Sequence, residues 1–92
     1  MRRVDEIRRR LTEAFSPTQL IIEDQSHRHA GHAGARESGG GHFAVTIEAA
    51  AFAGRNALSR HKMVYAALAG MMPGEIHALS VRATAPGEEI AR

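Results

Sequence analysis

The chain has 92 residues, with six histidines, no cysteine and a formal net charge of +2 at pH 7. This length suffices for one small domain with a modest core, and the lack of cysteine excludes a disulfide framework and a thiol nucleophile. The small net charge does not supply the concentrated basic stripe of a dedicated duplex-DNA binder. No apolar run approaches the ~20 residues of a membrane span, and acidic residues stand where an export signal needs an apolar run, so we expect a cytoplasmic protein.

The first element is predicted to be an amphipathic helix that ends at about Ser16, because Pro17 disfavours a helical conformation in the residue before it. Two acidic residues each precede an arginine by four positions, a spacing that stabilises helices; the pairs are Asp5–Arg9 and Glu6–Arg10. We interpret the three consecutive arginines at positions 8–10 as a solvated helix face rather than as a stripe for nucleic acid. The apolar stripe expected to be buried contains Val4, Ile7, Leu11, Ala14 and Phe15.

Residues 19–25 are predicted to form a short strand because their centre is β-branched, and a loop over residues 26–41 follows. The loop has no helical or strand periodicity and ends in three consecutive glycines, so we expect it to be mobile. Loops of this length are uncommon in small domains and are usually functional or disordered. This one carries His27, His29 and His32.

Residues 42–49 alternate in a way that predicts a half-buried strand, and residues 50–54 predict a short turn or helical piece with Phe52 as a core anchor. The buried face of the strand is expected to contain Phe43, Val45, Ile47 and Ala49.

A second long helix is predicted over residues 55–72, with His61 in the middle of its apolar face; Pro73 and Gly74 end it. The other residues of that face are Ala57, Leu58, Val64, Tyr65, Leu68 and Met72.

The last strand is predicted over residues 75–83. His77 stands at its beginning, and Leu79 and Val81 share one face. The polar tail, residues 86–92, is expected to be frayed.

The element order, helix, strand, loop, strand, helix and strand, indicates the α+β class. A helix that connects two strands of one sheet makes them parallel, whereas the first strand can pair antiparallel with the second across the loop. We therefore predict a single domain over residues 1–92 that contains a small three-stranded mixed sheet. Helices should cover one face, and the other face should be partly open.

The histidines suggest a metal or cluster site, since imidazole is the commonest protein ligand for borderline metals. A chain without cysteine must supply nitrogen to such a site, and any sulfur ligands must come from another molecule.

Four segments of the chain resemble the BolA-like proteins. They are Asp-Gln-Ser-His-Arg-His-Ala-Gly-His at 24–32, His-Phe-Ala-Val-Thr-Ile at 42–47, Arg-His-Lys-Met-Val-Tyr-Ala-Ala-Leu at 60–68 and Ile-His-Ala-Leu-Ser-Val at 76–81. Phe52 and Gly54 also fit, and the resemblance extends over nearly the whole chain. Its most specific part is the Arg-His-Lys motif followed by the Ile-His-Ala-Leu motif.

The resemblance implies a fold like the type II KH domain, with a helix-turn-helix-like segment before the last strand. It also implies a monothiol glutaredoxin as partner, with a 2Fe–2S cluster bridged between the two proteins. The glutaredoxin cysteine and a glutathione thiol would supply sulfur, and the BolA-like chain would supply nitrogen. We expect a monomer in isolation and a heterodimer with the partner.

Carried over by position, the implied ligands are His29 in the loop and His77 at the start of the last strand. His32 and His27 are alternative loop ligands, because the loop holds three histidines. The subgroup of the family that uses a loop cysteine is ruled out by composition. Glycines at 39–41 replace an acidic pair found in many relatives, which should loosen the loop.

The remaining candidates have other interpretations. His42 is interpreted as structural, either cross-strand or anchoring the loop, and His61 as a core histidine, with a role in setting the geometry near His77. Arg60 and Lys62 are expected to point outward and to contact glutathione or an acidic partner surface; the alternative is that they are ordinary solvated charges.

These expectations favour an iron–sulfur adaptor in cluster trafficking or iron and redox regulation. An enzyme is disfavoured because no nucleophile–base pair, phosphate loop or carboxylate dyad is visible. The alternative is a DNA-binding transcriptional regulator that uses the helix-turn-helix-like segment, with Arg55, Arg60 and Lys62 as a thin recognition surface. The loop histidines could also chelate zinc or copper without a partner.

Overall fold

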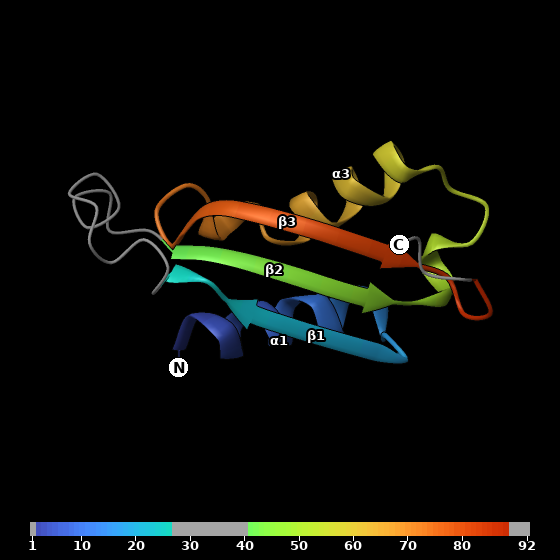
Figure 1. Ribbon diagram of the computed structural model, residues 1–92, viewed down its shortest axis with the longest axis horizontal. Coiled ribbons are helices and arrows are strands. Elements are labelled where there is room, and N and C mark those ends of the chain that lie inside the picture. The colour runs from blue at the N-terminus through green and yellow to red at the C-terminus, as the bar shows by residue number, and fades with distance from the viewer. Residues whose placement is uncertain (1, 27–40, 89–92) are drawn as a thin grey trace.

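The structure, a computed structural model, describes residues 2–26 and 41–88. Its elements in chain order are α1 (Arg2–Phe15), β1 (Gln19–Asp24), β2 (Gly41–Glu48), the 3-10 helix η2 (Ala50–Phe52), α3 (Ala57–Ala67), the 3-10 helix η3 (Ala69–Met71) and β3 (Ile76–Thr84) (Figure 1). None of the helices in these two ranges is long and apolar enough to cross a membrane.

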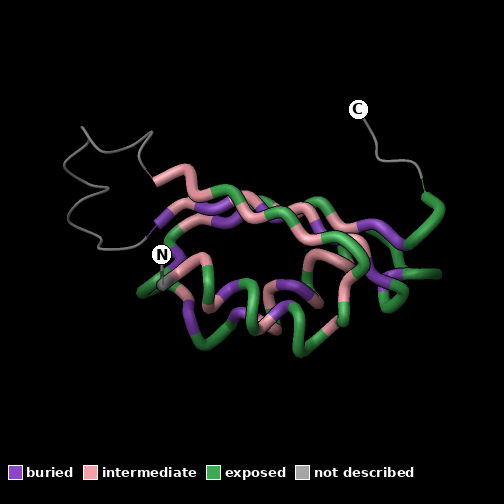
Figure 2. The backbone as a smooth tube through the Cα atoms, turned by 90° about the horizontal axis from the view of Figure 1, so that it is seen from below, coloured by how far each residue is buried: buried purple, intermediate pink, exposed green. Residues whose placement is uncertain are grey.

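The strands form one sheet in the order β1-β2-β3, in which β1 is antiparallel and β3 parallel to β2. Both α1 and α3 lie on the same side, so the molecule has one layer of helices and one layer of strands (Figure 2). The predicted α+β class, the mixed three-stranded sheet and the one-sided helices are therefore confirmed. We call the side of the sheet away from α1 and α3 the open face.

The alternation in β2 decides which side chains enter the core. Phe43, Val45 and Ile47 are at most 2% exposed, as predicted, and the residues between them point to the open face because side chains alternate along a strand. Full burial of each such side chain contributes about 1.5–3 kcal/mol. The core is completed from the helical layer by Ile7, Leu11, Phe52, Val64 and Leu68.

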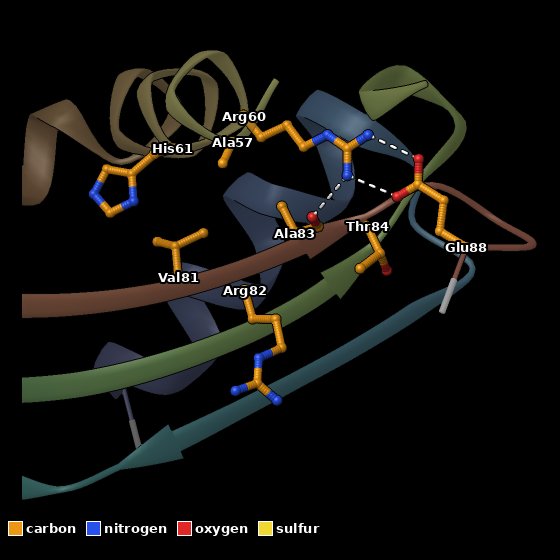
Figure 3. A pocket seen from close by; sticks show the side chains of 8 residues that line it. All are labelled: Ala57, Arg60, His61, Val81, Arg82, Ala83, Thr84 and Glu88. Carbon is orange, nitrogen blue, oxygen red and sulfur yellow. Dashed lines mark hydrogen bonds and ion pairs between the residues drawn. The ribbon is translucent and has the colours of Figure 1, made fainter. Parts of the chain in front are cut away.

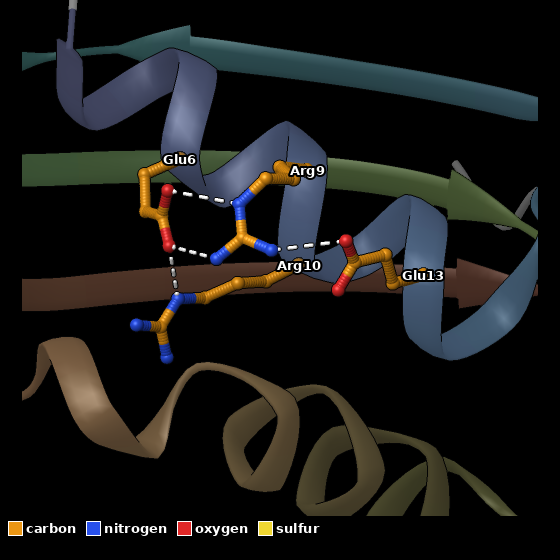
Figure 4. Close-up of polar contacts among 4 residues, drawn as sticks. All are labelled: Glu6, Arg9, Arg10 and Glu13. Carbon is orange, nitrogen blue, oxygen red and sulfur yellow. Dashed lines mark hydrogen bonds and ion pairs between the residues drawn. The ribbon is translucent and has the colours of Figure 1, made fainter.

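The solvent-facing side of α1 carries a network of ion pairs (Figure 4). Arg9 donates to Glu6 at 2.6 Å and to Glu13 at 2.9 Å, and Arg10 donates to Glu6 at 2.7 Å. The predicted Glu6–Arg10 pair is confirmed. Because glutamates neutralise these arginines, α1 presents a solvated face of mixed charge, as expected, and not a basic stripe.

The second long helix is shorter than predicted. α3 begins after Asn56, whose side chain accepts a hydrogen bond from the Ser59 N–H at 2.8 Å. It ends at Ala67, where the chain tightens into η3; the change in pitch buries Met71 rather than Met72.

Three residues expected in the buried stripes are exposed. Leu58 is 62% exposed and Ala57 beside it is exposed as well, because the first turn of α3 borders a hollow at the end of β3. The third is Ala14 near the end of α1.

The expectation of a frayed tail from residue 86 is wrong for Glu88. Its carboxylate accepts hydrogen bonds from Arg60 at 2.7 and 2.8 Å. A tight turn makes this pairing possible, because the Glu88 N–H donates to the Ala85 carbonyl at 3.1 Å. The last four residues of the predicted tail lie outside the described residues.

Candidate metal centre

His77 is exposed at the beginning of β3, where the pairing with β2 is irregular. A register shift, a β-bulge, lies between Gly41 and His42: Gly41 pairs with Ile76, but His42 pairs with Ala78. Ile76 and Leu79 are both buried although they are three residues apart, as a bulge that adds one residue requires. His77 is thereby turned to the open face.

His42 lies next to His77. It is the neighbour of buried Phe43 in β2, so its side chain also points to the open face. The two imidazole rings have centroids 5.5 Å apart and are inclined by 45°. The structure thus brings together two imidazole rings, one from the start of each of two parallel strands.

The loop that precedes β2 leaves the sheet at the same point. The Gln25 N–H donates to the His42 carbonyl at 2.7 Å, and the His42 N–H donates to Ser26 Oγ at 3.0 Å. On the other side, the Gly41 N–H donates to the Glu75 carbonyl at 3.1 Å. Both ends of the loop are therefore hydrogen-bonded within reach of the start of β3. His27, His29 and His32 themselves lie outside the described residues.

The donor set at this end of the sheet is incomplete for a metal ion by itself. Within residues 2–26 and 41–88, no three or more histidine, cysteine, aspartate or glutamate side chains are grouped so that they could hold a metal. Two imidazoles without a thiolate fit a site that is completed by ligands from the loop or from another molecule. Mixed imidazole and thiolate ligation of a 2Fe–2S cluster is chemically sound.

Arg60 does not point outward as predicted. Its side chain is 14% exposed and is paired with Glu88, and its Nη1 atom donates to the Ala83 carbonyl at 3.1 Å. Ala83 follows His77 by six residues along β3, which corresponds to about 20 Å at the rise of a strand. Arg60 therefore lies at the opposite end of β3 from the histidine pair.

Lys62 is exposed, as predicted, and it makes no ion pair with any described residue. His61 is half-buried rather than fully in the core, and its ring stacks on Tyr65 with centroids 4.5 Å apart. His61 borders the same hollow as Val81 and Ala83, which places it toward the end of β3 rather than beside His77.

His42 lies across from His77 and holds the base of the loop through its backbone, in agreement with its interpretation as a cross-strand or loop-anchoring residue. The parallel pairing of the two strands was predicted, and parallel strands that begin together bring their first residues side by side. What the sequence does not reveal is the bulge that turns His77 to the same face as His42.

Residues 11–88 match the family described as BolA-like protein. The chain is 39% identical over 88 residues to Protein BOLA1, chloroplastic, from Arabidopsis thaliana, and the match covers 94% of this chain and 55% of that protein. It is 35% identical over 77 residues to the DNA-binding transcriptional regulator BolA of Escherichia coli (strain K12), with 84% of this chain and 70% of that protein covered. The solved structure of BolA1 from Arabidopsis thaliana matches with a TM-score of 0.78, 32% identity and 95% coverage of both chains. The chain thus spans just over half the length of the curated plant relative.

Proposed function

The chain belongs to the BolA-like protein family, and from this premise we propose that it is an iron–sulfur adaptor without catalytic activity of its own. It forms a heterodimer with a monothiol glutaredoxin and supplies imidazole ligands to a 2Fe–2S cluster held between the two proteins. The glutaredoxin cysteine and a glutathione thiol supply the sulfur ligands that this chain lacks.

The observation that carries the proposal is the exposed position of His77 beside the hydrogen-bonded base of the loop. His29 follows Ser26 by three residues, so chain geometry keeps their Cα atoms within roughly 11 Å of each other. The corresponding limit for His32 is roughly 22 Å. His29 is the loop ligand in the proposal because its position matches the one that the family resemblance implies, and His32 is the alternate.

The ring of His42 adds a third candidate. It lies 5.5 Å from the ring of His77 and needs no movement of the loop to reach the same metal. In the proposal, His42 either replaces the loop histidine as the second ligand or holds the ring of His77 in place.

Reconstitution tests these assignments. Iron and sulfide are added anaerobically to a monothiol glutaredoxin and glutathione, with and without this chain, and the visible absorption and circular dichroism are compared. We expect His77→Ala to abolish the spectrum of the mixed complex and His29→Ala to alter it. His61→Ala is the matched control, because that histidine stacks on Tyr65 away from the site. Spectra unchanged in both His77→Ala and His29→Ala would overturn the ligand assignment, and an altered spectrum in His42→Ala alone would assign the second ligand to His42.

Lys62 remains the proposed contact for glutathione or for an acidic partner surface, since it is exposed on α3. Arg60 is not proposed for that contact, because its guanidinium is largely buried and paired with Glu88. The proposal also keeps the cytoplasmic location, which fractionation tests directly.

The second candidate function is DNA-binding transcriptional regulation, which the name of the Escherichia coli relative favours. The exposed turn at Gly54 leads into α3, as in a helix-turn-helix-like segment. Against it, Arg60 is engaged by Glu88, which leaves Arg55 and Lys62 as a small basic surface. A gel shift at increasing salt tests it, because binding through phosphate contacts weakens steeply with salt.

A further inference from the structure

A hollow of about 340 Å³ lies between the first turns of α3 and the end of β3 (Figure 3). It is at the opposite end of β3 from His77, so it is separate from the proposed cluster site. Its walls combine the apolar side chains of Ala57, Val81 and Ala83 with polar ones, which include those of Arg60, Arg82 and Glu88. In Figure 3 the side chains of Arg60 and Glu88 point toward each other.

The guanidinium of Arg60 is held in the geometry of a carboxylate receptor. Its Nη1 and Nη2 atoms donate to the two oxygens of Glu88 at 2.7 and 2.8 Å, the paired arrangement in which arginine recognises carboxylates. Nη1 also donates to the Ala83 carbonyl at 3.1 Å, which fixes the plane of the fork. The Nε atom is buried and has no hydrogen-bond partner among the described residues.

The side chains of Arg60 and Glu88 differ in how far they are buried. The Arg60 side chain is 14% exposed, whereas that of Glu88 is 39% exposed. Glu88 lies beyond the last strand, on a turn that is closed by its own backbone and carboxylate hydrogen bonds with Ala85. Ala85 at the start of this turn is buried, but Pro86, Gly87 and Glu88 are exposed, so movement of residues 86–88 alone removes few core contacts.

An arginine that is mostly buried cannot be left without a counter-ion, because an unpaired buried charge is strongly destabilising. The exchange that the geometry allows is therefore one carboxylate for another. We propose that the hollow is a binding site for a peptide carboxylate, that Glu88 occupies it in the free chain, and that an external carboxylate takes its place when the turn at 85–88 opens. The carboxylate can come from an acidic side chain or from the C-terminus of a peptide.

Removal of the internal carboxylate tests the proposal. Glu88→Gln keeps the size of the side chain but deprives Arg60 of its counter-ion. We expect N-acetylglutamate α-amide, which has only a side-chain carboxylate, or N-acetylalanine, which has only a C-terminal one, to bind this variant at least tenfold more tightly than the wild type. Binding is followed by NMR through the Arg60 Nε–H and the Ala83 amide. Whichever ligand binds more tightly identifies the source, and N-acetylglutamine α-amide is the neutral control.

Two further variants keep the test decisive. Arg60→Lys in the Glu88→Gln background should lose the binding, because an ammonium cannot form the paired contact. Gly87→Ala strains the turn, since Gly87 has a φ of 90°, and should tighten binding even if Glu88→Gln does not fold. Failure of both carboxylates to bind folded Glu88→Gln or Gly87→Ala would overturn the proposal, as would equal binding of the neutral control. The result is independent of the cluster experiment, because none of these residues is a proposed ligand.

Discussion

Gly41 lies so close to Phe43 that a Cβ atom on the glycine would come within 2.6 Å of the phenylalanine ring and 2.7 Å of Ser26 Oγ. Ser26 Oγ in turn accepts the hydrogen bond from the His42 N–H. The first residue of β2 must therefore lack a side chain for the core and the base of the histidine loop to approach each other. This relationship leads to the first prediction.

Gly41→Ala should destabilise the protein by about 1–3 kcal/mol, the usual cost of overpacking. Urea unfolding measures this effect as a lowered midpoint with an unchanged slope. Gly74→Ala is the matched control, since a Cβ there meets nothing within 4 Å. Equal stability of the two variants would show that the ring of Phe43 gives way easily.

A second prediction concerns the start of α3. The Asn56 side chain satisfies the Ser59 N–H at 2.8 Å, one of the amide groups without an intrahelical partner. Asn56→Ala should lower the free energy of unfolding by about 0.5–2 kcal/mol, while Asn56→Asp should retain most of the stability. Thermal melts followed by circular dichroism compare the three proteins. A loss of the same size in Asn56→Asp would mean that the capping hydrogen bond does not cause the effect.

A third prediction concerns the free edge of β3. This strand pairs only with β2 among the described strands, and two of its carbonyls are bound by α3: Leu79 by the Tyr65 hydroxyl at 2.9 Å and Ala83 by Arg60 at 3.1 Å. Tyr65→Phe keeps the ring that stacks on His61 but removes the donor. It should cost about 0.5–1.5 kcal/mol in urea unfolding, and no change would indicate that water replaces the hydroxyl at the Leu79 carbonyl.

Much of this fold could be predicted because local patterns and topology agree. The alternation through Phe43, Val45 and Ile47 identified the buried face of β2, and the helix between the last two strands identified their parallel pairing. The start of α3 was less predictable: Leu58 has the right spacing for the buried face, but a hollow lies between the first helical turn and the end of β3. Periodicity shows which residues share a side of a helix, but it does not show how much of that side the sheet covers.

The candidate site could be predicted only in part, for a similar reason. His77 followed from a motif, but its pairing with His42 depends on a bulge that neither strand signals by its composition. The Arg60–Glu88 pair joins residues that are 28 positions apart in the sequence. It depends on the turn after β3, whose conformation is determined by tertiary contacts. The sequence alone could not distinguish Lys62, which is exposed to solvent, from Arg60, whose side chain is paired with Glu88.

The fourth prediction concerns acid stability. Hydrogen bonds from Arg9 and then Arg10 lower the pKa of Glu6 from 4.5 to about 2, and Arg60, with the Ala85 N–H, lowers the pKa of Glu88 from 4.5 to about 2. Both carboxylates are thus easier to ionise in the folded chain than in the unfolded one. Their contribution to stability is fully present above about pH 4.5 and is lost as the pH falls toward 2, because the unfolded state binds more protons in that window.

Glu6→Gln and Glu88→Gln should therefore each lower the stability at pH 7 and flatten its decline between about pH 4.5 and 2, and the double variant should flatten it further. The two pairs share no residue, so their effects should add. Unfolding by urea at a series of pH values measures the slopes, and Glu75→Gln serves as control because Glu75 makes no ion pair within residues 2–26 and 41–88. At 1 M salt the Glu6 effect should shrink more than the Glu88 effect, since the arginine that binds Glu88 is the more buried and is screened less. A decline as steep in the double variant as in the wild type would show that other carboxylates govern the acid transition.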